Sequence, residues 1–263
     1  MDVGCGLGYL GYNYFGHGGS YIGVDISAKL PGDSRKASRD WAIGGEAHFI
    51  NADAYNIPLA DSSADLAMCQ VIMMHLINPR DALAEMVRVV KPGSLVICFE
   101  PDNLSSSLIK RYWSMPELSI DELLLYYKII LITHRGRIKL GRGDTNIGVK
   151  LAHMMAKLGL VDIDVRLNDN VWFIEPPYKG EIQQHRLKIA RRNMLDDNQT
   201  KFWREKEREE FIAGGGDPDE YDRCAAIGDR HKPIAREQFD NGTYFGFASH
   251  DMYIIKGYKS CGR

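Results

Sequence analysis

Paired cysteines are missing from this sequence, and so are the usual metal-binding motifs. The cysteines form no Cys-x-x-Cys pair, unlike the closely spaced sets of small disulfide-stabilised secreted domains. None of the eight histidines forms a His-Glu-x-x-His motif or pairs with cysteines at the spacing of a zinc site. We therefore expect a reduced, cytoplasmic protein with no bound metal. The five cysteines are Cys5, Cys69, Cys98, Cys224 and Cys261.

Long hydrophobic runs and a strong net charge are missing as well. No apolar run approaches the ~20 residues that span a bilayer, and we recognise no signal peptide. The formal net charge is −2, so bulk electrostatics favours neither nucleic acid nor an anionic membrane as a partner. The basic stretch 185–192 and the mixed-sign stretch 204–210 are typical of solvated helix faces. We predict neither a nucleic-acid nor a membrane partner, and the oligomeric state stays open.

Glycine is concentrated in the first dozen residues. Asp2-x-Gly4-x-Gly6-x-Gly8 leads from a short strand into a helical pattern, and Gly6-x-Gly8-x-x-Gly11 overlaps it. Glycine lets the backbone approach a ligand and adopt positive φ in a tight strand-to-helix turn. The second spacing also fits a dinucleotide-binding loop, but there the first glycine directly follows the strand. Asp2 instead favours S-adenosylmethionine (SAM), because an acid can bind its ammonium group.

A second carboxylate ends the next apolar run. The segment 21–25 is predicted to be a strand with Asp25 at its tip. An ionised carboxylate only accepts hydrogen bonds and can take both ribose hydroxyls at once. Asp25 is therefore a candidate ribose-binding residue, a role that fits NAD and SAM equally.

The order of the later motifs distinguishes these two ligands. Asp53 follows a third apolar run, 65–70 forms a fourth strand, and 88–93 precedes the strand 95–100. With these motifs the sequence resembles class I SAM-dependent methyltransferases, closest in style to the ubiquinone and menaquinone biosynthesis type and to uncharacterised bacterial relatives. The resemblance covers residues 1 to about 100 and resumes in the last two strands. It implies an α/β fold, a Rossmann-like sheet of about seven strands with a helical cap built from two insertions.

The resemblance also implies a SAM site along the ends of the first four strands. The methionine end would be held by Asp2, Gly4, Cys5 and Gly6, and the ribose and adenine by Asp25 and Ile26. The edge of the adenine would be held by Asp53 and Ala54, and the sulfur end by Gln70 and Val71. His75, just beyond the fourth strand, is the candidate catalytic residue, because a neutral imidazole there can accept a proton from a hydroxyl or thiol. A histidine that only caps the loop is an equally good interpretation.

The rest of the chain alternates core segments with insertions. Only Met1 precedes Asp2, so we expect the first strand to be cut short, either because the sequence is a fragment or because its true start lies upstream. A short helix is predicted at 34–43, and Asn78-Pro79 predicts a helix that stops at 92–93. The predicted segments are 1–101 for the SAM-binding core with its shortened start, 102–143 for a lid insertion, 144–167 for a core helix and strand, 168–246 for a helical cap insertion, and 247–263 for the last core strand.

These observations predict a SAM-dependent methyltransferase that transfers a methyl group in line to a small-molecule acceptor. Both insertions carry aromatic residues and leave the sheet at the ends where ligands bind, so we expect them to close over a small, partly apolar acceptor. Two alternatives stay open: a non-catalytic SAM-binding or nucleotide-sensing protein, and an NAD(P)-dependent oxidoreductase. The sequence does not predict whether O, N, S or C is methylated.

Overall fold

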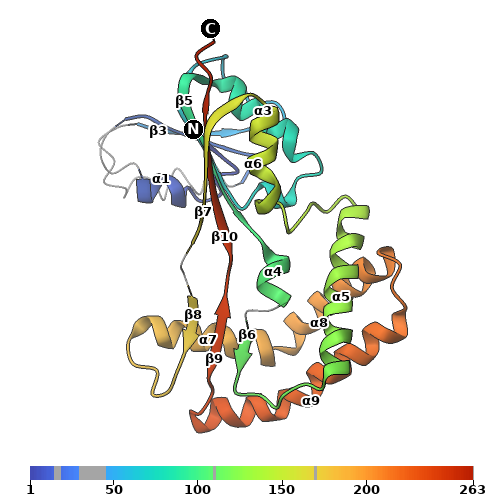
Figure 1. Cartoon of the computed structure of the whole chain (residues 1–263). Helices are drawn as coiled ribbons and strands as arrows, with labels where there is room; N and C mark the ends of the chain where they lie inside the picture. Colours follow the sequence, from blue (N-terminus) through green and yellow to red (C-terminus); the bar gives the residue numbers. More distant parts are fainter. Residues whose placement is uncertain (15–18, 30–45, 109–110, 169–170, 263) are drawn as a thin grey trace. The chain divides into compact units, whose positions relative to one another are not determined.

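The structure, a computed structural model, describes residues 1–14, 19–29, 46–108, 111–168 and 171–262. The chain divides into two compact units, which are described separately (Figure 1). Unit 1 comprises Met1–Pro101, Asn146–Asn168 and Met252–Arg263, and unit 2 comprises Asp102–Thr145 and Asp169–Asp251. The helix predicted at 34–43 lies outside the described residues.

In the described residues of unit 1, seven strands form one sheet. Their bounds are β1 Asp2–Val3, β2 Tyr21–Asp25, β3 Ala47–Asn51, β4 Ala64–Gln70, β5 Val90–Pro101, β7 Leu160–Leu167 and β10 Met252–Lys259. The order across the sheet is β3-β2-β1-β4-β5-β10-β7. The strands from β3 to β5 run parallel, and β10 is antiparallel to both β5 and β7. The predicted Rossmann-like sheet is thus confirmed, and its order reverses between β1 and β4, which is where open α/β sheets bind ligands.

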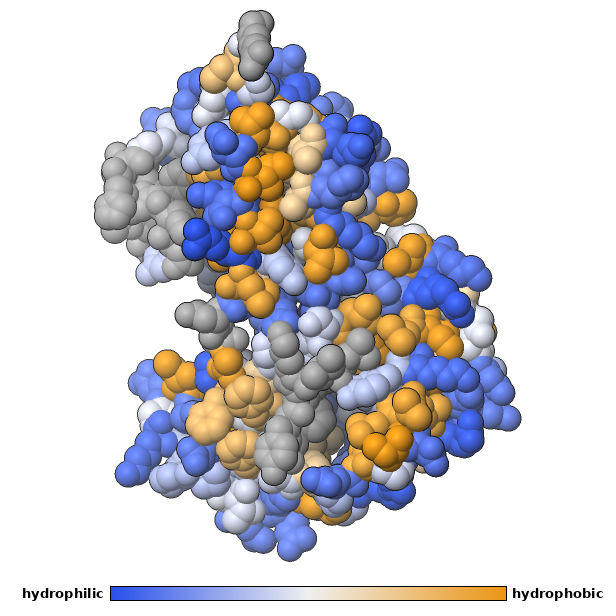
Figure 2. Space-filling view, in the orientation of Figure 1, coloured by the Kyte–Doolittle hydropathy of each residue, from blue (hydrophilic) through white to orange (hydrophobic). Residues whose placement is uncertain are grey.

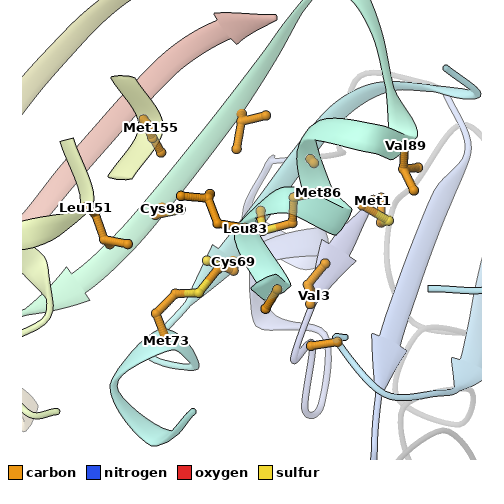
Figure 3. Close-up of a cluster of buried hydrophobic side chains, with 14 of the residues drawn as sticks. Met1, Val3, Cys69, Met73, Leu83, Met86, Val89, Cys98, Leu151 and Met155 are labelled. Carbon is orange, nitrogen blue, oxygen red and sulfur yellow. The ribbon is translucent and has the colours of Figure 1, made fainter. Parts of the chain in front are cut away.

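The core of unit 1 occupies both faces of this sheet because side chains alternate along each strand. The helices are α1 Tyr9–Tyr14, α3 Pro79–Val89 and α6 Gly148–Lys157, with a short 3₁₀ helix η2 at Met73–His75. One hydrophobic cluster joins α3 and α6 to the sheet through Leu83, Leu151 and Cys98 (Figure 3). A second cluster on alternate strand residues contains Tyr21 and Met68, together with Leu10 of α1. The sheet is therefore covered on both faces, as a mainly parallel sheet requires.

Helix α3 begins where the sequence predicts, but its end differs. Asn78 is its N-cap and Pro79 its first residue, whereas the helix stops at Val89 rather than at 92–93. Strand β5 already begins at Val90 and includes the Pro-Gly pair. The pairing of β4 with β5 is irregular between Ala64 and Leu66, and proline is tolerated at such a strand start because a ladder hydrogen bond is not needed there.

Unit 2 combines helices with a small sheet. The helices are α4 Asn103–Leu108, α5 Ile120–Lys139, α7 Glu181–Leu195, α8 Asp197–Ala213 and α9 Pro218–Asn241, and the strands are β6 Arg111–Trp113, β8 Val171–Ile174 and β9 Gly246–Ser249. The three strands form an antiparallel sheet in the order β6-β9-β8. The sequence predicts only a helical cap here, so this sheet was missed. Because β9 pairs with both other strands, 247–251 belongs to unit 2, and the last boundary moves from 246/247 to 251/252.

The helices of unit 2 are fixed by local capping and by close approach. Ser119 and Glu122 form a reciprocal capping box at the start of α5. Near the end of α5, Gly136 faces the carbonyl of Glu210 so closely that an added Cβ would collide with it. Apolar side chains lie among hydrophilic ones over the face drawn in Figure 2. No helix in the described ranges has both the length and the apolar character that crossing a membrane requires.

Candidate functional site

The glycine loop connects β1 to α1 through three residues with positive φ. The φ values are 69° at Gly4, 50° at Gly6 and 82° at Gly8. The backbone N–H groups of Gly4 and Cys5 both donate to the carbonyl of Val24, at 2.7 and 3.1 Å. Residues with a side chain rarely adopt positive φ, so the spacing of the glycines reflects the backbone conformation that this turn requires.

Asp25 ties this loop to the tip of β2. Its Oδ2 accepts a hydrogen bond from the backbone N–H of Gly6 at 3.0 Å, and its Oδ1 accepts one from the N–H of Ser27 at 2.9 Å. A carboxylate offers about four lone-pair sites. Asp25 can therefore hold the loop and still accept hydrogen bonds from a ligand.

A cavity of about 240 Å³ lies at the carboxyl ends of the strands around β1. It brings together residues from the glycine loop, the tips of β2 and β3, and the loop after β4, as expected at the point where the strand order reverses. The predicted site residues that line it are Gly4, Asp25, Ile26, Asp53, Ala54, Val71 and His75. It is completed by Val3, Val24, Ala52, Ile72 and Leu76.

Four other predicted residues, Asp2, Cys5, Gly6 and Gln70, are not among the described residues that line the cavity. The side chain of Asp2 is only 1% exposed, and its Oδ2 accepts a hydrogen bond from the Tyr21 hydroxyl at 2.6 Å. Its Oδ1 is buried and has no hydrogen-bond partner within the described part of the chain. Burial raises the pKa of Asp2 to about 7. The structure thus directs Asp2 into the core beside the loop.

The loop after β4 forms the opposite wall of the cavity and contains a strained residue. Val71 has φ of 56°, which is an outlier for a β-branched side chain and is typical of functional sites. Its backbone N–H donates to the carbonyl of Phe99 at 2.9 Å. The side chain of Ile72 lies against Gly4, since a Cβ at Gly4 would be 2.5 Å from its Cδ1.

Glu100, at the end of β5, holds this loop, and sequence reasoning missed it. Its Oε1 accepts hydrogen bonds from the backbone N–H groups of Ile72 and Met73, both at 2.9 Å, and its Oε2 accepts one from Met74 at 3.3 Å. Burial raises the pKa of Glu100 to about 7, although these N–H groups act to lower it. The signal in the sequence that could have revealed this role is that Glu100 ends an apolar strand. A carboxylate in such a buried position needs hydrogen-bond partners.

His75 and Asp53 lie on exposed turns at the rim of the cavity. His75 ends η2, and its backbone N–H donates to the carbonyl of Ile72 at 2.8 Å. Asp53 Oδ1 accepts a hydrogen bond from the backbone N–H of Tyr55 at 3.0 Å. In the described ranges, no three His, Cys, Asp or Glu side chains come close enough together to hold a metal ion.

Comparison with known proteins finds similarity to methyltransferases in the first 98 residues, which contain this cavity. Residues 1–98 match the family described as methyltransferase domain. An uncharacterized methyltransferase of Mycobacterium ulcerans is 35% identical over 97 residues, which are 37% of this chain and 36% of the relative. An O-methyltransferase of Penicillium expansum is 28% identical over 131 residues, covering 47% of this chain and 48% of that protein. The chain thus spans less than half the length of these curated relatives.

Solved structures with the same fold cover nearly the whole chain. The YcgJ protein from Bacillus subtilis has a TM-score of 0.52 at 16% identity, over 99% of this chain and 91% of that one. A putative methyltransferase from Bacillus halodurans has a TM-score of 0.50 at 12% identity, over 98% and 91% of the two chains. The fold is that of the Rossmann-like class I methyltransferases. Residues 1–98 are therefore similar to methyltransferase domains, in the family match and in these relatives.

Proposed function

We propose that this protein transfers a methyl group from SAM to a small-molecule acceptor. The observation that carries the proposal is the carboxylate of Asp25, which is bonded to the glycine loop and lines the cavity where the strand order reverses. A ribose at the tip of the second strand of such a sheet meets an acid in this position. The family match of residues 1–98 supports SAM over other nucleosides.

The residues present fit this cofactor. A Cβ built on Gly6 meets nothing within 4 Å, so the bare backbone of the loop leaves space for the methionine end of a ligand. Asp25 retains lone pairs for two ribose hydroxyls. Ile26 is 72% exposed in the structure, although its side chain is apolar and lines the cavity, and covering it with an adenine ring would remove apolar surface from water.

When bound, SAM supplies an electrophilic methyl group that an acceptor's nucleophilic atom takes in line. The chain's own residues then have three tasks. Asp25 and the glycine loop fix the position of the cofactor, which can supply ~7 kcal/mol or more of the barrier through effective molarity. Glu100 holds the loop after β4 in place. His75 is placed on the cavity rim, where a neutral imidazole can accept a proton from an acceptor hydroxyl or thiol.

The proposal also specifies that the methyl acceptor is a small molecule. It is supported by the resemblance to the ubiquinone and menaquinone biosynthesis type, and by the similarity to an O-methyltransferase of Penicillium expansum. We also keep our predictions that the protein is cytoplasmic and that neither nucleic acid nor a membrane is its partner.

Calorimetry with SAM, S-adenosylhomocysteine and NAD⁺ tests the function. We expect the first two to bind and NAD⁺ not to bind. A screen of small phenols, amines and thiols with methyl-labelled SAM should then show transfer to at least one class. Binding without transfer to any of them would favour a non-catalytic SAM-binding protein, and a preference for NAD⁺ would favour an oxidoreductase.

Alanine at two neighbouring glycines should separate folding from binding. In Gly4→Ala the new Cβ meets the Ile72 side chain at 2.5 and 2.9 Å, so we expect a stability loss of about 2 kcal/mol or more. In Gly6→Ala there is positive-φ strain of about 1 kcal/mol but no collision, so SAM binding should weaken more than the melting temperature falls. Equal losses of stability, or full SAM affinity in Gly6→Ala, would contradict this assignment.

A further inference from the structure

Unit 2 contains a cavity of its own, of about 520 Å³. It is lined from one side by β8 and β9 and from the other by α7. The strand residues alternate and therefore share one face of the sheet, and the helix residues recur on one face of α7. The lining residues are Trp172, Ile174, Ile189, Ala190, Asn193, Met194, Tyr244, Gly246, Ala248 and His250.

The register of the two strands explains why this face leaves space. Trp172 is opposite Ala248, and Ile174 is opposite Gly246. Each large side chain of β8 therefore faces a very small residue of β9, whereas a well-packed sheet face would fill both positions. A Cβ on Gly246 would lie 3.1 Å from the Tyr244 hydroxyl, so even a methyl group would crowd this side of the cavity.

The chemistry of the lining favours a neutral ligand. Among the described lining residues there is no acid, lysine or arginine. The guanidinium of Arg186 lies 5.3 Å from the centre of the Trp172 ring, and one of its N–H groups donates to the carbonyl of Phe173 at 3.2 Å. A cationic ligand would meet this positive charge with no carboxylate to pair with, and buried unpaired charge is strongly unfavourable.

Two polar groups can orient such a ligand. Tyr244 is 2% exposed, and its hydroxyl makes no hydrogen bond with a residue that the structure describes. Burial raises its pKa to about 12, so the hydroxyl stays protonated and can donate. The amide of Asn193, on the α7 side, offers both a donor and an acceptor.

We propose that this cavity binds a neutral, planar, largely apolar small molecule that carries one hydroxyl or carbonyl group. Its volume and its apolar lining with a few polar groups are those of small-molecule sites. The Trp172 ring and the small residues Ala248 and Gly246 opposite β8 suit a fused-ring compound, which can pack edge-on or offset against an aromatic side chain. The site lies within unit 2 and does not depend on SAM.

The probe is 2-naphthol, titrated by calorimetry into the full chain without SAM. We expect a dissociation constant of about 0.1–1 mM, as for a fragment of this size. The protonated amine 2-(aminomethyl)naphthalene should bind at least about tenfold more weakly. No binding of 2-naphthol up to its solubility, or equal binding of the cation, would overturn the proposal.

Two variants locate the bound probe. Ala190→Leu fills the cavity and should weaken 2-naphthol binding at least about tenfold, whereas Ala226→Leu, the same change at an exposed position of α9, should leave it unchanged. Tyr244→Phe removes only the hydroxyl and should weaken binding about 3- to 10-fold with the fold intact, which keeps the test decisive if Ala190→Leu unfolds. If Ala190→Leu folds and binds normally, or if Tyr244→Phe binds normally, the probe occupies another site and the proposal fails. Lack of methyl transfer would not affect these results.

Discussion

Replacing Asp25 with alanine is expected to weaken SAM binding by about 100-fold or more. The carboxylate would accept two hydrogen bonds from the ribose, and charge-assisted bonds of this kind contribute ~1.5 to 3 kcal/mol each. The substitution also removes the acceptor for the backbone N–H groups of Gly6 and Ser27. The glycine loop therefore loses its tie to β2 in addition to the lost contacts with the ligand.

The measurement is calorimetric titration with SAM and S-adenosylhomocysteine, which should lose affinity equally because both carry the ribose. Asp65→Ala is a matched control, since it truncates an exposed aspartate near the start of β4, where its carboxylate pairs with Lys91 at 2.6 Å. That variant should bind SAM like the natural sequence. Unchanged affinity in Asp25→Ala would remove this residue from the binding site.

Much of unit 1 could be predicted from the sequence because its signals are local. The order of the motifs along the chain implies, through the family resemblance, a Rossmann-like sheet, which is confirmed. The glycine spacing predicts a strand-to-helix turn, and all three glycines of this loop have positive φ. Asp25, Asp53 and Val71 line one cavity because each lies at or just beyond the carboxyl end of a strand, and these ends of parallel strands meet at one edge.

The direction of a side chain could not be predicted where only two strand residues are present. Asp2 and Val3 form the whole of β1 and point to opposite faces. Two residues are too few for an alternating pattern, so the sequence does not show which of the two side chains is available to a ligand. In the structure the carboxylate of Asp2 accepts a hydrogen bond from the hydroxyl of Tyr21. The strands of unit 2 were missed for a related reason: the pairing of Trp172 with Ala248 joins residues far apart in the sequence, so no local pattern reveals either the sheet or its cavity.

Glu100 shows the same limit, since its partners come from a loop 26 to 28 residues earlier in the chain. We expect Glu100→Ala to destabilise the protein by about 3 kcal/mol or more at pH 5, because backbone N–H groups of Ile72, Met73 and Met74 lose their acceptor and at least two of these residues are buried. The loop that supplies Val71 and His75 to the cavity would lose its support, and SAM affinity should fall with it. Glu100→Gln keeps one acceptor oxygen and should have a smaller effect.

The same residue should make stability depend on pH in a direction opposite to that of a salt-bridged acid. Burial raises the folded-state pKa of Glu100 from 4.5 to about 7, so between these values the native state holds a proton that the unfolded state releases. The unfolding free energy therefore falls as pH rises through this window, by about 2 to 3 kcal/mol between pH 5 and pH 8. Neither variant has a group that titrates at this position, so this loss of unfolding free energy is confined to the natural sequence. The stability of each variant relative to the natural sequence should therefore rise by the same amount between pH 5 and pH 8. The raised pKa of Asp2 is common to all three proteins and cancels in the difference. Urea denaturation at pH 5, 6, 7 and 8 measures the gap, and a gap between Glu100→Gln and the natural sequence that does not change with pH would show that Glu100 does not titrate in this window.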